Sequence, residues 1–121
     1  MSAEISVHKD YILVESKEGI DYREIRRAVA RLFYASGIPE KNGIWVFHEG
    51  QEKFSYDDIY KLKNIIKENY PKDVKINKTA IVVESSLQSR MAQTFLQIAE
   101  DLPFKIRVFS DFHAAEDWVK K

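Results

Sequence analysis

The chain has 121 residues, the length of one domain, and a domain of this size buries roughly two-thirds of the surface that its unfolded chain exposes. Its 19 basic and 19 acidic residues cancel, so no net charge draws the whole molecule to nucleic acid or to an anionic bilayer. The absence of cysteine excludes disulfides and thiolate chemistry. No signal peptide or membrane-spanning run is present, so we expect one cytoplasmic domain over residues 1–121.

Two short extended runs and a helix make up the first third of the chain. The runs 5–8 and 11–15 flank a polar turn and predict a hairpin at the edge of a sheet. Asp21 then occupies a helix N-cap position, with Glu24 in the first turn. The helix carries an apolar stripe to about Ser36, where a glycine and a proline predict its end.

The middle third predicts a buried strand and a second helix. Gly43–Phe47 is apolar at every side-chain position, which indicates a central strand covered on both faces. Ser55 and Asp58 form a capping box at the start of the next helix, and Phe54 and Ile59 occupy the hydrophobic-staple positions. Apolar residues recur along one face of this helix as far as the proline that ends it.

The last third predicts a strand, a helix, a strand and a final helix. The runs 78–84 and 104–109 are rich in β-branched residues and predict the two strands. Ser86 and Asp111 are available as N-caps for the two helices. The first helix is expected to bury a stripe of Leu87, Met91, Phe95, Ile98 and Leu102, and the final one a stripe of Phe112, Ala115, Trp118 and Val119.

This alternation of strands and helices predicts the fold class. Parallel strands joined by right-handed helical crossovers are the usual solution for such an order. We therefore expect a single α/β domain with the order ββαβαβαβα, whose sheet is mostly parallel with an antiparallel strand at its N-terminal edge.

Five segments, taken together, point to a family. They are the opening hairpin, the helix after Glu18-Gly-Ile-Asp21, the strand Gly43–Phe47, the helix starting at Ser55, and the ending Lys105-Ile-Arg-Val-Phe-Ser-Asp111 followed by Ala114-Ala-Glu-Asp-Trp118. These segments resemble STAS-like domains, a group that includes the bacterial anti-sigma factor antagonists and a branch called SpoIIAA-like. The resemblance covers nearly the whole chain in the order of its elements, and it implies a βα superhelix with sequential strands, a fold shared with lipid-binding proteins of the CRAL-TRIO type.

The resemblance also implies a non-enzymatic regulatory domain that binds a protein partner. In the antagonists, a phosphorylated serine in an Asp-Ser-Ser-Gly-like motif at the start of the second helix switches partner binding. Here only Ser55 matches that motif, and its role as a helix cap is the simpler interpretation. On this reading the partner surface comprises Ser55, Tyr56 and the loop His48–Lys53, which includes Glu49.

Polar residues also follow each parallel strand, where helix N-termini commonly bind ligands. They are His48, Glu49, Glu84, Ser85, Ser86, Ser110, Asp111 and His113. Their spacing matches no catalytic elbow and no metal-binding motif, so we expect no catalytic residue, no metal and no cofactor, and a hydrolase-like enzyme is the least favoured function.

The first helix carries a dense group of arginines: Arg23, Arg26, Arg27 and Arg31. Guanidinium groups on one exposed stripe could hold phosphates, lipid head groups or an acidic partner, although a solvated helix face explains them as well. The alternative function is therefore a module that encloses a small apolar or lipid-like ligand, with this stripe near its charged end. Exposed Tyr56, Tyr60 or Trp45 could mediate self-association, and core-facing aromatic residues argue against nucleic-acid binding.

Overall fold

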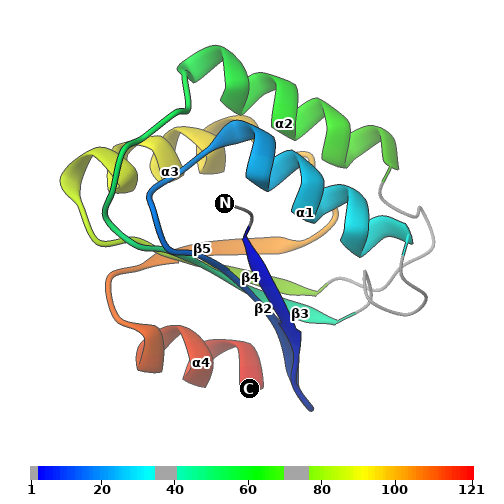
Figure 1. Cartoon of the computed structure of the whole chain (residues 1–121). Coiled ribbons are helices and arrows are strands. Elements are labelled where there is room, and N and C mark those ends of the chain that lie inside the picture. The colour runs from blue at the N-terminus through cyan, green and yellow to red at the C-terminus, as the bar shows by residue number, and fades with distance from the viewer. Residues whose placement is uncertain (1–2, 35–40, 70–76) are drawn as a thin grey trace.

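The computed structural model describes residues 3–34, 41–69 and 77–121 (Figure 1). The predicted order ββαβαβαβα is confirmed. The end signals of the first two helices, Gly37, Pro39 and Pro71, lie outside the described residues. The elements are β1 (Glu4–Val7), β2 (Tyr11–Ser16), α1 (Tyr22–Tyr34), β3 (Asn42–Phe47), α2 (Tyr56–Asn69), β4 (Lys78–Val82), α3 (Ser86–Ile98), β5 (Lys105–Phe109) and α4 (Phe112–Lys120).

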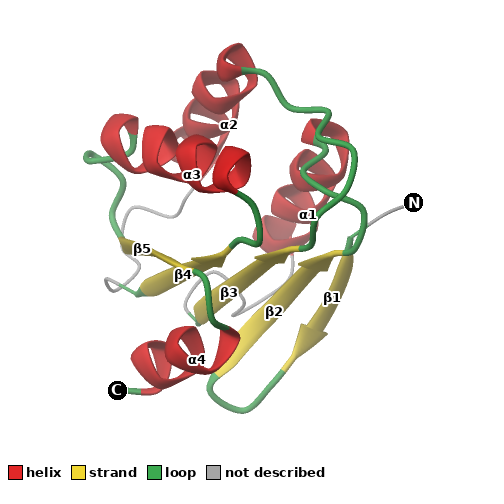
Figure 2. Cartoon of the chain, turned by 90° about the vertical axis from the view of Figure 1, so that its left-hand side faces the viewer, coloured by secondary structure: helices red, strands yellow, loops and turns green. Residues whose placement is uncertain are grey.

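The five strands form one sheet in the sequential order β1-β2-β3-β4-β5. Strand β1 pairs antiparallel with β2 at one edge, and all other neighbours are parallel, as expected. Because the strands advance in one direction, the right-handed crossovers α1, α2 and α3 all cover the same face of the sheet (Figure 2). Helix α4 covers the opposite face of the sheet (Figure 2).

Strand β3 is the centre of the molecule. Ile44 and Val46 are 0% and 7% exposed and form a core with Ala115 and Val119 of α4. Phe47 points to the other face, into the core under α1, α2 and α3. The prediction of a central strand buried on both faces is therefore confirmed.

The helices begin where short polar side chains satisfy their first N–H groups. The Asp21 carboxylate accepts from the backbone N–H groups of Arg23 and Glu24 at 2.9 and 3.3 Å. Ser55 and Asp58 form the predicted capping box, with N–O distances of 2.9 and 3.2 Å between each backbone nitrogen and the partner's side chain. These caps determine the residue at which each helix begins.

The start of α3 differs from the prediction in one residue. Its N-cap is Ser85, whose hydroxyl accepts from the backbone N–H of Gln88, and not Ser86. The buried face of the helix accordingly contains Gln88, Met91 and Ala92, whereas Leu87 is 40% exposed. The expected burial of Leu87 is thus wrong, because the i, i+3, i+4 stripe starts one residue later.

Side-chain hydrogen bonds join α4 to the amino-terminal ends of β2 and β3. The Tyr11 hydroxyl donates to Glu116 at 2.7 Å, and the Asn42 amide donates to the Val119 carbonyl at 2.6 Å. Burial raises the pKa of Tyr11 to about 12, and the Glu116 carboxylate adds to that rise. Helix α4 is thereby fixed across the sheet face opposite the other helices.

Candidate functional site

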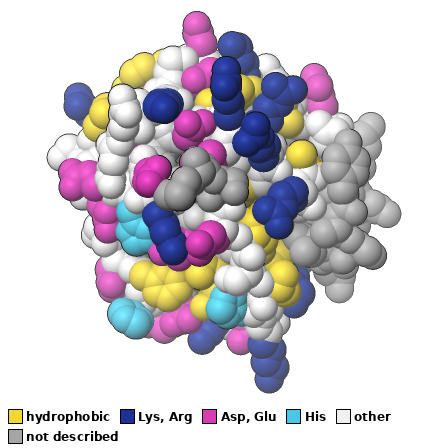
Figure 3. All heavy atoms as spheres, in the orientation of Figure 1, with side chains coloured by type: hydrophobic (Ala, Val, Ile, Leu, Met, Phe, Trp, Pro, Cys, Tyr) yellow, Lys and Arg dark blue, Asp and Glu magenta, His cyan; other side chains and the backbone are white. Residues whose placement is uncertain are grey.

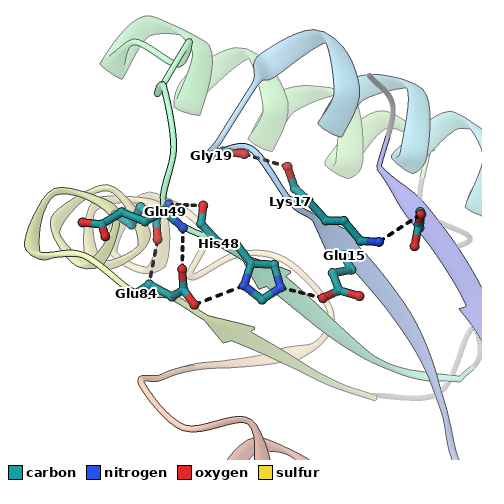
Figure 4. A network of polar contacts seen from close by, with 9 residues as sticks. Glu15, Lys17, Gly19, His48, Glu49 and Glu84 are labelled. Carbon is teal, nitrogen blue, oxygen red and sulfur yellow. Dashed lines mark hydrogen bonds and ion pairs between the residues drawn. The ribbon is translucent and has the colours of Figure 1, made fainter.

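Three titratable side chains meet at the carboxyl edge of the sheet. The His48 imidazole lies between two carboxylates, with Nε2 at 2.5 Å from Glu15 and Nδ1 at 3.1 Å from Glu84 (Figure 4). Glu15 belongs to β2, His48 follows β3 and Glu84 lies just beyond β4. The cluster therefore links three neighbouring strands at the points where their loops begin. We call Glu15, His48 and Glu84 the edge cluster.

The contacts within the edge cluster shift its proton equilibria. Hydrogen bonds to Glu15 and then to Glu84 raise the pKa of His48 above 6.5, because both carboxylates favour the imidazolium form. The backbone N–H of Glu49, followed by His48, lowers the pKa of Glu84 below 4.5. The geometry therefore favours the protonated form of His48 and the ionised form of Glu84.

The edge cluster should make stability depend on pH. A raised folded-state pKa means that the His48 contribution is fully present below 6.5, the value in the unfolded chain, and is lost as pH rises through the folded value. The Glu84 contribution is present above 4.5 and is lost as pH falls through its lowered folded value. Urea denaturation should therefore show the largest difference in unfolding free energy between wild type and His48→Gln near pH 6, and a smaller one at pH 9.

The size of this pH effect is limited by solvent. The His48 side chain is 36% exposed, so screening keeps its contribution below about 1 kcal/mol. In Glu15→Gln, the His48 contribution to stability should be lost at a lower pH than in the wild type, because the Glu15 carboxylate is the main cause of the raised pKa of His48. Stability curves of wild type and His48→Gln that run parallel from pH 6 to pH 9 would contradict the assignment.

A buried glutamine organises the backbone behind the edge cluster. The Gln88 side chain is 0% exposed, and its amide nitrogen donates to the His48 carbonyl at 3.0 Å and to the Glu52 carboxylate at 2.7 Å. Its amide oxygen accepts from the backbone N–H of Glu84 at 2.9 Å. One side chain of α3 thus holds the chain after β3 and after β4 in fixed positions.

The loop after β3 also packs directly against the loop after β2. The backbone N–H of Lys53 donates to the Ile20 carbonyl at 2.7 Å, and the Tyr22 N–H donates to the Lys53 carbonyl at 3.1 Å. Gly19 has a φ of 93°, which favours glycine, and a Cβ there would lie 2.9 Å from the Glu52 carboxylate. The segments 18–22 and 49–53 therefore form one rigid rim.

The structure brings together only part of the polar edge that the sequence singles out. His48 contacts Glu84, and Glu49 takes part through its backbone N–H, while its side chain is exposed. Asp111 has a separate role, because its carboxylate accepts from the first N–H groups of α4. Within the described residues, no three His, Asp or Glu side chains are arranged to hold a metal ion.

Ser55 and Tyr56 lie at the start of α2, apart from the edge cluster. The Ser55 hydroxyl is engaged as the N-cap, whereas Tyr56 and Tyr60 are 51% and 52% exposed. Trp45, by contrast, packs against the core. Of the three aromatic residues considered for self-association, only the two tyrosines are therefore strongly exposed.

The arginines of α1 form an exposed basic surface, and Figure 3 shows Lys and Arg side chains gathered over the part of the molecule formed by α1 and α2. The four are Arg23, Arg26, Arg27 and Arg31. Within the described residues, no ion pair joins any of these arginines to a carboxylate. None of them lines the cavity that lies between α1 and the sheet.

The cavity lies between the sheet and helices α1, α2 and α3, and its volume is about 160 Å³. Hydrophobic side chains from both layers make up nearly all of its wall. Among the residues that the structure describes, the polar side chains of the lining are those of Lys41, Asn77 and Thr79, near the start of β3 and β4. Within residues 3–34, 41–69 and 77–121, six aromatic rings contribute to the wall: Phe33, Trp45, Phe47, Phe54, Phe95 and Phe104.

Sequence reasoning missed two members of the edge network, Glu15 and Gln88, and it gave an enclosed apolar ligand only as its alternative, without the residues that line the cavity. Glu15 lies near the carboxyl end of β2, so its place beside the polar edge could have been inferred from the parallel arrangement of the strands. Gln88 carries no such signal, because a polar residue in a helix is ordinarily placed on the solvent side. The cavity depends on how side chains of three helices and three strands of the described residues meet, and no local pattern encodes that arrangement.

None of the helices in residues 3–34, 41–69 and 77–121 combines the length and apolar character that crossing a bilayer requires. Comparison of the chain with family models, with curated proteins and with solved structures found no match, so the resemblance to STAS-like domains stays a prediction.

Proposed function

We propose that this chain is a non-enzymatic binding domain that holds a small apolar molecule between the sheet and helices α1, α2 and α3. The observation that supports the proposal is the cavity of about 160 Å³ with its almost wholly hydrophobic wall. An empty space of this kind is costly, because the atoms that line it lose dispersion contacts on one side. A ligand that fills the cavity restores those contacts.

The volume and the wall together define the class of ligand. An apolar cavity of about 150 Å³ in an engineered protein stays dry and takes up benzene, which sets the scale. Typical drug-sized pockets are larger, about 300 Å³ or more. Because six aromatic rings line the wall, edge-to-face contacts favour a ligand with one aromatic ring.

The two tryptophans allow a direct test. Trp45 lines the cavity, whereas Trp118 packs against Phe109 on the opposite face of the sheet, with ring centroids 5.8 Å apart. Ethylbenzene should therefore change the emission of Trp118→Phe, in which Trp45 is the only tryptophan, and should leave the emission of Trp45→Phe unchanged. It should also raise the melting temperature of the wild type, since a ligand that binds only the folded state stabilises it.

A cavity-filling variant provides the control. Ala92 of α3 is 7% exposed and lines the cavity, so Ala92→Leu should occupy part of the space and abolish the response to ethylbenzene while the fold is retained. Equal responses from wild type and Ala92→Leu, or no response from either, would remove the proposal.

A protein partner at the start of α2 is a second candidate. The observation that favours it is the pair Tyr56 and Tyr60, which are about half exposed beside Ser55. Exposed tyrosines one helical turn apart provide apolar area with polar tips, as binding surfaces often do. Partner binding is the second candidate function, after ligand binding, because the Ser55 hydroxyl already has a structural role as the N-cap of α2. A photo-reactive residue in place of Tyr60 that crosslinks to no protein in the source cell would count against it.

A further inference from the structure

The outer face of α1 consists almost entirely of arginine. Five side chains of this helix are exposed within the described residues, and all but the small Ala30 are arginines: Arg23, Arg26, Arg27 and Arg31. The acidic residues of the stretch 21–34 are Asp21 and Glu24, which both lie at its amino-terminal end. The later turns of the outer face therefore present only positive charge, in the region where Figure 3 shows basic side chains gathered.

The use of arginine on this face is not explained by solvation alone. Lysine is the commoner cation elsewhere in the chain, and four of the six arginines of the chain are concentrated on α1. A solvated surface needs only charge, which the compact and strongly hydrated lysine ammonium provides. The guanidinium group is more weakly hydrated, and its planar set of donors matches the oxygens of phosphates and carboxylates. The concentration of arginine therefore favours contact with anions.

The arginines are arranged to meet a surface and not to enclose a small ligand. Arg23, Arg27 and Arg31 follow one another at four-residue intervals, which spreads them over about 12 Å of the helix axis. They lie on the outer, convex side of α1, and none of them lines the cavity on the other side of the helix. A convex face meets anions from one direction only, so an extended surface that carries many anionic groups fits it best.

Among such surfaces, an anionic lipid surface fits better than a protein or a nucleic acid. Protein interfaces usually depend on large apolar or aromatic anchors, whereas the exposed apolar side chain described on this face is only Ala30. Proteins that bind single-stranded nucleic acid stack bases on exposed aromatic rings, and none of the exposed side chains described on α1 is aromatic. Lipid head groups can move toward each guanidinium, so a cluster of basic side chains is enough for attraction.

We propose that the outer face of α1 docks the domain on the surface of a membrane that contains anionic lipids. The inner face of the helix belongs to the core, where Ile25 and Val29 are 5% and 4% exposed, so α1 cannot sink into the bilayer without opening the domain. The contact is therefore electrostatic and lies at the level of the head groups. Each cation near such a surface strengthens binding about fivefold, so four give half-maximal binding at about millimolar lipid. The docking does not depend on a ligand in the cavity.

Co-sedimentation of the whole chain with vesicles tests this docking. Phosphatidylcholine vesicles that contain phosphatidylserine should bind the wild type in about 0.1 M salt and release it in about 1 M salt, because the Debye length falls from about 10 Å to about 3 Å. Vesicles of phosphatidylcholine alone should not bind it. Arg26→Gln combined with Arg27→Gln should weaken binding about 25-fold, which is about fivefold for each charge removed.

Lys120→Gln combined with Lys121→Gln is the matched control. Both lysines are exposed at the end of α4, which covers the opposite face of the sheet, and their replacement changes the net charge by the same amount. This variant should bind as the wild type does, and both double variants should keep the wild-type melting temperature because every replaced side chain is exposed.

Equal weakening in the two double variants would overturn the proposal, because net charge and not the face of α1 would then decide binding. A wild type that fails to sediment with the phosphatidylserine vesicles at about 10 mM lipid would overturn it as well. Binding to a single-stranded oligonucleotide, but not to these vesicles, would assign the arginines to nucleic acid instead. None of these outcomes bears on the response of the cavity to ethylbenzene, so the proposed function is tested separately.

Discussion

Gln88→Leu is expected to lower the free energy of unfolding by about 3 kcal/mol, although leucine has a similar size and is more hydrophobic. The buried amide of Gln88 makes three hydrogen bonds, to the His48 carbonyl, the Glu52 carboxylate and the Glu84 N–H. Leucine would leave the His48 carbonyl and the Glu84 N–H without this partner, although the Glu52 carboxylate would still accept from the backbone N–H of Ile20. Each unsatisfied buried group costs about 1–3 kcal/mol. Urea denaturation monitored by circular dichroism measures the loss.

Gln93→Leu is the matched control, because Gln93 lies on the same helix but is exposed. This substitution should change the stability by no more than about 0.5 kcal/mol. Gln88→Leu should also increase the amide exchange of Glu84, whose N–H loses its acceptor. Equal stability of the two variants would show that the network around Gln88 does not hold the two loops.

The order of the elements could be predicted from the sequence because each element carries its own signal. The capping box of Ser55 and Asp58 forms as the spacing indicates, and Asp21 and Asp111 cap their helices. The wholly apolar run in β3 correctly indicates a central strand. Local chemistry decides these features, so a local pattern is enough to find them.

The candidate site was less predictable because its parts come from different strands. The contact between Glu15 and His48 depends on the parallel register of β2 and β3, in which Ser16 pairs with Phe47. Alternation within one strand shows which face a residue occupies, but not which residue lies opposite on the next strand. The side of the sheet that α4 covers is equally a property of the assembled chain.

The cavity illustrates a further limit of sequence patterns. A small residue on the inner face of a helix, such as Ala92, usually permits close approach of a neighbouring element, and Ala92 is buried, yet it lines the cavity. Small residues either let two elements come close or leave space between them, and the positions of all surrounding side chains decide which occurs. The apolar stripes of α1, α2 and α3 are thus compatible with either a filled or a hollow layer.

The last prediction concerns the contact between the loops that follow β2 and β3, which Gly50→Ala should break. A Cβ on Gly50 would lie 2.4 Å from the carbonyl carbon of Glu18 and 2.7 Å from the backbone nitrogen of Gly19. These atoms belong to the main chain and cannot turn aside as a side chain would. The two loops must therefore separate, which strains the bond between Lys53 and Ile20.

We expect Gly50→Ala to lower the unfolding free energy by about 1–3 kcal/mol, the usual cost of overpacking, and to raise the amide exchange of Lys53 and Tyr22. Gly43→Ala is the matched control, since its Cβ would meet no atom closer than 3.7 Å and glycine is unfavourable within a strand by about 0.5–1 kcal/mol. That control should leave stability unchanged or increase it. A Gly50→Ala protein as stable as Gly43→Ala would mean that the loops are not held in the close contact described here, and the rigid rim beside the edge cluster would have to be abandoned.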